Sequence, residues 1–120
     1  MKESAIKFLQ LSASGEVAEA FDNLVAPGFK HHNPYFKGDA ASLRTAMQEN
    51  AAMNPGKILE VQRALQEGEL VAVHSKVRLN ENAKSIALAH IFRFDAGKIV
   101  ELWDIAQPEP DAMPNEYGMF

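Results

Sequence analysis

The amino-acid sequence predicts an α+β fold in which three N-terminal helices pack on a curved antiparallel sheet shaped like a half-cone. Two observations lead to this fold class. Apolar residues recur with a helical period of about 3.6 before the break at residues 54–56 and with a period of 2 after it. The alternating segments follow one another through short turns, which is the order expected of an antiparallel sheet. A curved sheet covered by helices on one face leaves a cavity between the two layers.

The helices are expected before the break. Apolar side chains at helical spacing define the first helix, over residues 2–11. Ser14 is expected to cap a second helix, which Pro27-Gly28 ends. Asp39 is a suitable N-cap for a third helix. Between the second and third helices, the sequence FKHHNPYFKGD at residues 29–39 is expected to form a loop because of its Asn-Pro step and its glycine.

Four strands and a tail are expected after the break. Residues 57–67 alternate weakly between apolar and polar side chains, and residues 70–79 alternate clearly. Residues 85–94 and 98–107 are interpreted as the two arms of a hairpin, and the Pro-rich residues 108–120 as a C-terminal tail. The chain contains no linker and no internal repeat, so residues 1–120 are interpreted as a single domain.

The loop of this hairpin determines the pairing of its arms. A three-residue loop formed by residues 95–97 would pair Phe94 with Lys98 and place a bulge at the glycine. A two-residue loop formed by Ala96 and Gly97 is the alternative. The longer loop is the preferred interpretation, because two-residue primed turns favour Asn-Gly or Asp-Gly.

The two loops predict different neighbours for His90. With the longer loop, His90 lies opposite Leu102, and Asp104 is its diagonal neighbour on the same face, roughly 7–8 Å away. With the shorter loop, Trp103 would lie opposite His90. In the preferred register, His90 and Asp104 share one face of the sheet, and Trp103 lies on the other.

Composition narrows the classes of function. The chain has a formal net charge of −4 and a sequence pI of about 5.5. We therefore expect no nucleic acid or membrane partner, because phosphate binding needs clustered Lys and Arg. The chain has no cysteine, so disulfide and thiolate chemistry are excluded. It also shows no signal-peptide pattern and no membrane-spanning apolar run, and we expect a cytoplasmic protein.

No cofactor and no metal are expected. The sequence contains no G-x-G-x-x-G motif, no P-loop and no G-x-S-x-G motif, so nucleotide binding and serine hydrolase chemistry have no support. It contains no H-x-x-x-H or H-E-x-x-H pair, and adjacent histidines seldom bind the same ion.

Several short motifs occur in an order typical of one superfamily. They are His32-Asn33-Pro34 followed by Gly38, IFRF at residues 91–94, GKIVE at residues 97–101, Trp103-Asp104 with Gln107, and GMF at residues 118–120. With its helices first, the chain resembles the SnoaL-like polyketide cyclase branch of the nuclear transport factor two-like superfamily, over nearly its whole length. The resemblance implies a cone-shaped, cystatin-like α+β barrel that is usually dimeric. Catalytic relatives use pocket carboxylates and histidines without a cofactor, whereas many others only bind ligands. Relatives often carry Asp where this chain has His90.

Three residues are candidate catalytic groups. Asp104 stands among apolar neighbours, where burial would raise the pKa of its carboxyl group and suit it to act as acid or base; alternatively it is solvated at the rim or bonded to Gln107. His90 can exchange protons near neutral pH beside Asp104, or it is a core histidine with one hydrogen-bond partner. The resemblance implies that His32 faces the mouth of the cone; alternatively it caps the nearby helix.

Other residues complete the expected site and surface. The expected ligand-binding residues are Tyr35, Leu88, Phe92 and Leu102. Asn33 is expected to form a local Asx turn before Pro34. Strand parity is expected to turn His74 away from the cavity, unless a bulge reverses it. Trp103 is expected to lie in a homodimer interface on the outer sheet face, because an exposed apolar face usually finds a partner.

We therefore expect a small cofactor-independent enzyme that uses acid-base chemistry on an apolar carbonyl compound. Aldol-type cyclisation, isomerisation and dehydration would all fit this chemistry. The alternative is a non-catalytic ligand-binding or dimerisation module of the same fold. Convergence of His32, His90 and Asp104 on one point of a pocket would favour catalysis.

Overall fold

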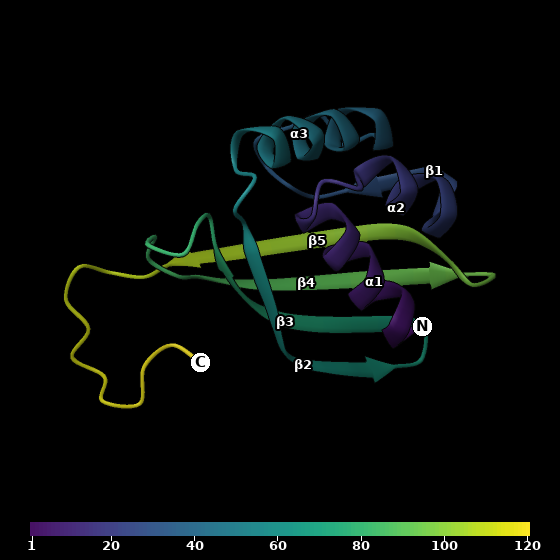
Figure 1. Ribbon diagram of the computed structural model, residues 1–120. Coiled ribbons are helices and arrows are strands. Elements are labelled where there is room, and N and C mark those ends of the chain that lie inside the picture. The colour runs from purple at the N-terminus through teal and green to yellow at the C-terminus, as the bar shows by residue number, and fades with distance from the viewer.

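The structure, a computed structural model, describes all 120 residues. They form three helices and five strands, with connecting turns and a C-terminal tail (Figure 1). In chain order they are α1 (Lys2–Ala13), α2 (Val17–Leu24), β1 (Val25–His31), α3 (Ala40–Met53), β2 (Ile58–Glu67), β3 (Leu70–Arg78), β4 (Ile86–Asp95) and β5 (Lys98–Pro108). The helices pack on one face of an open sheet, which confirms the predicted α+β class and is consistent with a half-barrel (Figure 1). No helix is both long and apolar enough to cross a membrane.

The sheet is mixed, with the strand order β1-β5-β4-β3-β2, because β1 pairs in parallel with β5. The prediction of a fully antiparallel sheet is therefore wrong, because it did not include β1. The second helix ends at Leu24, before Pro27-Gly28, as predicted, whereas residues 29–31, which were expected to begin a loop, belong to β1. Pro27 and Gly28 lie inside β1, where the pairing with β5 is irregular and Gly28 has a φ of +80°. An edge strand tolerates both residues, because one side of it needs no ladder hydrogen bonds. Beyond this irregularity, Phe29 and His31 are buried.

One of the two predicted helix caps is wrong. Ser14 ends α1, and its hydroxyl group donates to the backbone oxygen of Leu11 at 3.1 Å. The N-cap of α2 is Glu16, which makes no side-chain cap hydrogen bond. Asp39 caps α3 as predicted, because its carboxylate accepts a 3.0 Å hydrogen bond from the backbone N–H of Ser42.

The β4–β5 hairpin has the shorter loop and, in addition, a bulge. Asp95 pairs with Lys98, so the loop consists of Ala96 and Gly97, with φ values of 50° and 79°. Two positive φ values are typical of a type I′ turn, and the predicted three-residue loop is wrong because Ala96 adopts the left-handed conformation. Two residues farther along, Val100 has no partner on β4, and this extra residue shifts the register.

The bulge places His90 directly opposite Asp104. Neither predicted neighbour is found there, since Leu102 pairs with Phe92 and Trp103 pairs with a different residue of β4. The predicted sharing of a face is confirmed, because His90 and Asp104 line the same cavity, whereas Trp103 lies on the opposite, outer face. The prediction of which sheet face each of these side chains occupies is therefore correct, although both proposed registers are wrong.

Aromatic side chains fill the space between the first two helices and the inner sheet face. Phe8 of α1 packs edge-on against Phe92 of β4, with 5.8 Å between ring centres, and also contacts Phe21 of α2 at 5.3 Å. Leu102 of β5 belongs to the same buried cluster. This core anchors α1 on the inner sheet face through Phe8 and Phe92 and fixes one side of the cavity described below.

The C-terminal tail after β5 contains no helix or strand, and its end lies against the outer sheet face. The ring of Phe120 stacks on His74 of β3 with 5.9 Å between ring centres, and Nζ of Lys76 lies 5.2 Å from the ring centre of Phe120. His74 therefore points away from the cavity, as strand parity predicts.

Candidate active site

A cavity of about 230 Å³ lies between the inner sheet face and helices α1 and α3. Nine of its 15 lining residues are hydrophobic, so the polar groups among them act in largely apolar surroundings. The six polar lining residues are Ser12, Asn33, Asn50, Lys57, His90 and Asp104. Two of the three predicted catalytic residues, His90 and Asp104, are thus brought together here.

His90 lies on the floor of this cavity and is only 6% exposed. Burial lowers the pKa of its imidazole to about 4, and the nearby charge of Asp104 opposes this shift. The imidazole is therefore neutral near pH 7. Its ring stacks on Phe92, and its buried Nδ1 atom has no hydrogen-bond partner. A neutral imidazole can donate a hydrogen bond from one ring nitrogen and accept one at the other.

Asp104 is half-buried on β5, and Asn33 holds its carboxylate. The side-chain Nδ2 of Asn33 donates a 3.0 Å hydrogen bond to Oδ2 of Asp104. The amide is itself oriented, because Oδ1 of Asn33 accepts a 2.9 Å hydrogen bond from the backbone N–H of Tyr35. The predicted Asx turn is thereby confirmed. The second role of Asn33, in holding Asp104, is one that the sequence reasoning missed.

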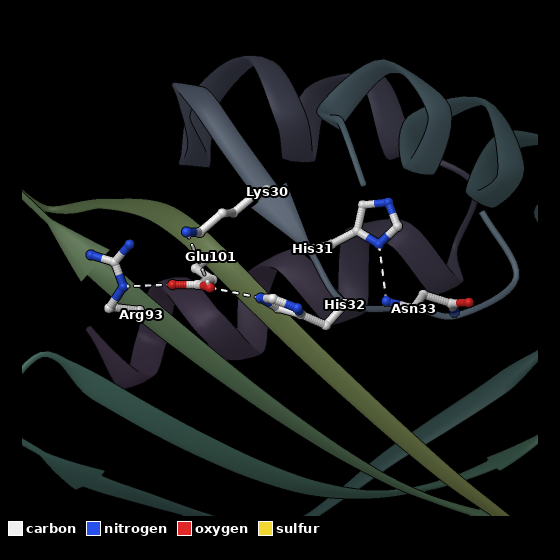
Figure 2. A network of polar contacts seen from close by, with 6 residues as sticks. All are labelled: Lys30, His31, His32, Asn33, Arg93 and Glu101. Carbon is white, nitrogen blue, oxygen red and sulfur yellow. Dashed lines mark hydrogen bonds and ion pairs between the residues drawn. The ribbon is translucent and has the colours of Figure 1, made fainter. Parts of the chain in front are cut away.

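Three consecutive residues at the end of β1 point in three directions (Figure 2). The ring of His31 is buried, where Nε2 donates to the backbone oxygen of Lys37 and Nδ1 accepts a 3.1 Å hydrogen bond from the backbone N–H of Asn33. His32 turns to the outer face and stacks on Trp103, with ring centres 5.0 Å apart and planes 7° from parallel. Asn33 then reaches the cavity.

The expectation that His32 faces the cavity is wrong. Its backbone N–H donates a 2.9 Å hydrogen bond to the backbone oxygen of Leu102, so the pairing of β1 with β5 continues past His31. Side chains alternate along a strand, and the burial of His31 therefore sends His32 outward. The three predicted catalytic residues do not converge on one point.

The outer-face partner of His32 is Glu101, which ties three strands together (Figure 2). Oε2 of this carboxylate accepts a 2.7 Å hydrogen bond from Nε2 of His32 and lies 3.7 Å from Nζ of Lys30. Oε1 accepts a 2.9 Å hydrogen bond from Nε of Arg93. The hydrogen bond from His32, followed by that from Arg93 and the charge of Lys30, lowers the pKa of Glu101. This network joins β1, β4 and β5 on the side away from the cavity.

The predicted ligand-binding residues fall into three groups. Leu88 lines the cavity, as predicted. Phe92 and Leu102 do not line it; they are 0% and 1% exposed because they belong to the buried core, so both lie outside the cavity that they were expected to line. Tyr35 is 85% exposed and lies outside the cavity, on the rim of a neighbouring surface hollow that also reaches Asp104.

The sequence reasoning also missed Lys57, which lines the cavity just before β2. Its Nζ donates to Oδ1 of Asn50 on α3, and burial lowers the pKa of its ammonium group. A lysine at the start of a strand is ordinarily a surface residue, so the sequence carried no signal for this position. Only the packing of α3 over the sheet brings it into the cavity.

The arrangement is suited to proton transfer in an apolar space. It combines an oriented carboxylate, a neutral imidazole and an ammonium group with apolar walls. No group of three or more His, Asp or Glu side chains lies close enough together to hold a metal ion.

Solved structures with the same fold support this architecture. AclR, a proposed hydroxylase from Streptomyces galilaeus, superposes with a TM-score of 0.74 at 20% identity, over 88% of this chain and 87% of the other. IdmH, a proposed polyketide cyclase from Streptomyces antibioticus, has a TM-score of 0.72 at 21% identity, over 87% and 89%. A nuclear transport factor two-like protein of unknown function from Cytophaga hutchinsonii has a TM-score of 0.69 at 16% identity, over 87% of each chain.

Sequence comparison identifies the family. No functionally curated protein matches the chain in sequence. The model of the SnoaL-like domain family matches residues 5–102, from α1 to the middle of β5, and so includes every polar residue of the cavity except Asp104. Because this match covers most of the chain, the protein belongs to the SnoaL-like domain family.

Proposed function

We propose that this protein is a cofactor-independent enzyme that moves a proton on a small apolar carbonyl compound. The observation that carries the proposal is the pairing of His90 with Asp104 across β4 and β5 inside a largely apolar cavity. A carboxylate and an imidazole in such surroundings are suited to general acid-base catalysis. The structural likeness to IdmH, a proposed polyketide cyclase, is in keeping with carbonyl chemistry.

In the proposed reaction, Asp104 is the base. A C–H bond next to the carbonyl group of the ligand breaks, its proton moves to the Asp104 carboxylate, and the electron pair forms an enolate. The neutral imidazole of His90, beside Asp104, assists by exchanging a proton with the ligand oxygen or with the enolate. Asn33 positions Asp104. His32 has no part in the reaction, because its ring lies on the opposite face of the sheet. Aldol-type cyclisation, isomerisation and dehydration can all begin with such an enolate.

The second candidate function is non-catalytic binding of the same class of ligand. The hydrogen bond from Asn33 to Asp104 favours it, since that carboxylate already has a protein partner. Both candidates predict that an apolar ketone occupies the cavity. Only the enzyme is expected to exchange the protons beside the carbonyl group.

The two candidates are separated with 2-tetralone, a compact apolar ketone with acidic C–H bonds, and the corresponding alcohol, which cannot form an enolate. We expect both compounds to raise the melting temperature of the protein. In deuterium oxide, we expect the protein to accelerate deuterium incorporation into the ketone well above the buffer rate. Binding of the ketone without accelerated exchange would favour the binding module, and binding of neither compound would contradict both candidates.

We also propose a homodimer formed through the outer sheet face. An outward row of apolar side chains crosses four strands in paired register: Leu65, Ala72, Ile91 and Trp103. Ile105, two residues along β5 from Trp103, is 62% exposed beside this row. A second copy related by a twofold axis would cover the same row on both chains.

The dimer proposal predicts that Ile105→Lys shifts the protein from dimer to monomer, because a charge buried in an apolar interface lacks a partner. Light scattering after size exclusion measures the mass. The control is Met53→Lys, which adds the same charge at an exposed apolar residue at the end of α3 and should leave the dimer intact. A monomeric wild-type protein would contradict the proposal.

A further inference from the structure

Lys57 is the only lysine or arginine among the residues that line the cavity. Its Nζ donates to Oδ1 of Asn50, which extends from the last turn of α3. Unlike Lys30 and Lys84, which lie beside carboxylates, Lys57 forms no ion pair. The ammonium group is thus held in place by a neutral partner and has no negative charge beside it.

This unpaired cation is half-buried in largely apolar surroundings. Burial of a charge without a counter-charge is unfavourable, and accordingly the pKa of Lys57 is lowered. An anionic oxygen entering the cavity would supply the missing counter-charge. Charge-assisted hydrogen bonds of this kind are stronger than neutral ones, especially where water is scarce.

Lys57 and Asp104 lie at opposite ends of the cavity. Lys57 immediately precedes β2, whereas Asp104 is on β5, and strands β3 and β4 lie between them. Three strand spacings amount to roughly 14 Å across the sheet. The register adds a displacement along the strands, because Asp104 lies level with Ala64 of β2 and not with Lys57. Apart from His90, which pairs with Asp104 at the far end, the lining residues on these two intervening strands are apolar: Val77 and Leu88. A ligand anion at the Lys57 end would therefore be kept away from the Asp104 carboxylate, which would repel it.

We propose that Lys57, held by Asn50, anchors an anionic oxygen of the ligand, so that the cavity selects an elongated apolar molecule with a carboxylate or similar anion remote from Asp104. This inference rests on the proposed function, because it names the ligand class of the same cavity. In the reaction, Lys57 fixes the far end of the substrate and thereby presents the reacting carbonyl end to Asp104 and His90. Its role is specificity and positioning rather than proton transfer.

The test compares biphenyl-4-carboxylate with biphenyl-4-carboxamide, which has the same shape and no charge. By calorimetry, we expect the wild-type protein to bind the carboxylate about tenfold or more tightly than the amide, in line with hydrogen bonds to charged groups. Lys57→Met keeps the length of the side chain and should abolish the preference. Lys57→Arg restores the charge and should retain most of it. Lys7→Met, which removes the same charge from an exposed site on α1, should leave the preference unchanged.

The result that overturns the inference is a wild-type protein without preference for the carboxylate, or a Lys57→Met variant that weakens both compounds equally. The wild-type comparison needs no variant, so a poorly folded Lys57→Met protein would not prevent a decision. Failure of the proposed function is visible separately. If the wild-type protein prefers the carboxylate but does not accelerate exchange in 2-tetralone, the anchor stands and the catalytic proposal falls.

Discussion

Replacing Asp104 by asparagine is expected to slow deuterium exchange into 2-tetralone by about 10²–10⁴-fold, the usual contribution of a positioned general base. The asparagine amide has nearly the shape of the carboxylate and can still accept the hydrogen bond from Asn33, so the cavity should keep its form. Binding of the ketone should therefore change little. Proton NMR measures the exchange rate and therefore reports on proton transfer. Melting temperatures with and without the ketone report on binding.

The matched control for Asp104 is His32→Ala. Like Asp104, His32 belongs to a motif on which the family resemblance rests, but its ring contacts Trp103 and Glu101 on the outer face. We expect this variant to be less stable, because it loses the hydrogen bond to Glu101, and to retain its exchange rate when folded. The assignment of the site would be refuted if Asp104→Asn kept the exchange activity and the folded His32→Ala variant lost it.

The stability of the protein is expected to fall steeply below pH 6.5 because of His90. The pKa of its imidazole is lowered from 6.5 to about 4 by burial, so between these values the unfolded chain binds a proton that the folded chain does not. By linkage, the contribution is fully present above pH 6.5 and is lost as the pH falls toward 4. Between pH 7 and pH 5 this amounts to about 2 kcal/mol of unfolding free energy, at 1.36 kcal/mol for each pH unit below 6.5.

Urea unfolding of the wild-type protein and of His90→Gln at pH 7, 6 and 5 measures this effect. Glutamine is polar and does not titrate, so its unfolding free energy should depend much less on pH over this interval. The difference between the two slopes isolates His90 from the carboxylates, which titrate mainly at lower pH. Parallel slopes would mean that His90 is accessible to protons in the folded state.

Hydrophobic periodicity was sufficient to predict most of the fold, because it reports directly which face of an element is buried. It failed where local residues carried a misleading signal. Pro27 and Gly28 normally stop an element, yet an edge strand accepts both. The register of the hairpin was not predicted either. It depends on the bulge at Val100, which arises from how β5 bends across β4 and cannot be read from the alternation of apolar and polar residues.

The candidate site was predictable to the extent that strand parity determined it. His90 and Asp104 share a face in any register that keeps parity, and the structure places both in the cavity. Asn33 and His32 exchanged their expected positions, because the backbone pairing with β5 extends to the N–H of His32, where the Asn-Pro step suggested a loop. Lys57 could not be predicted, since its burial depends on the tertiary packing of α3.

The location of the ligand is the central claim, and NMR titration of the wild-type protein with 2-tetralone tests it most directly. The inner cavity and the outer face carry separate reporters, the imidazole of His90 and the indole N–H of Trp103. We predict that the His90 ring signals and the side-chain amide of Asn33 shift on titration, while the indole signal of Trp103 and the ring signals of His32 remain in place. Shifts at Trp103 and His32 without shifts at His90 would place the ligand on the outer face and contradict the account.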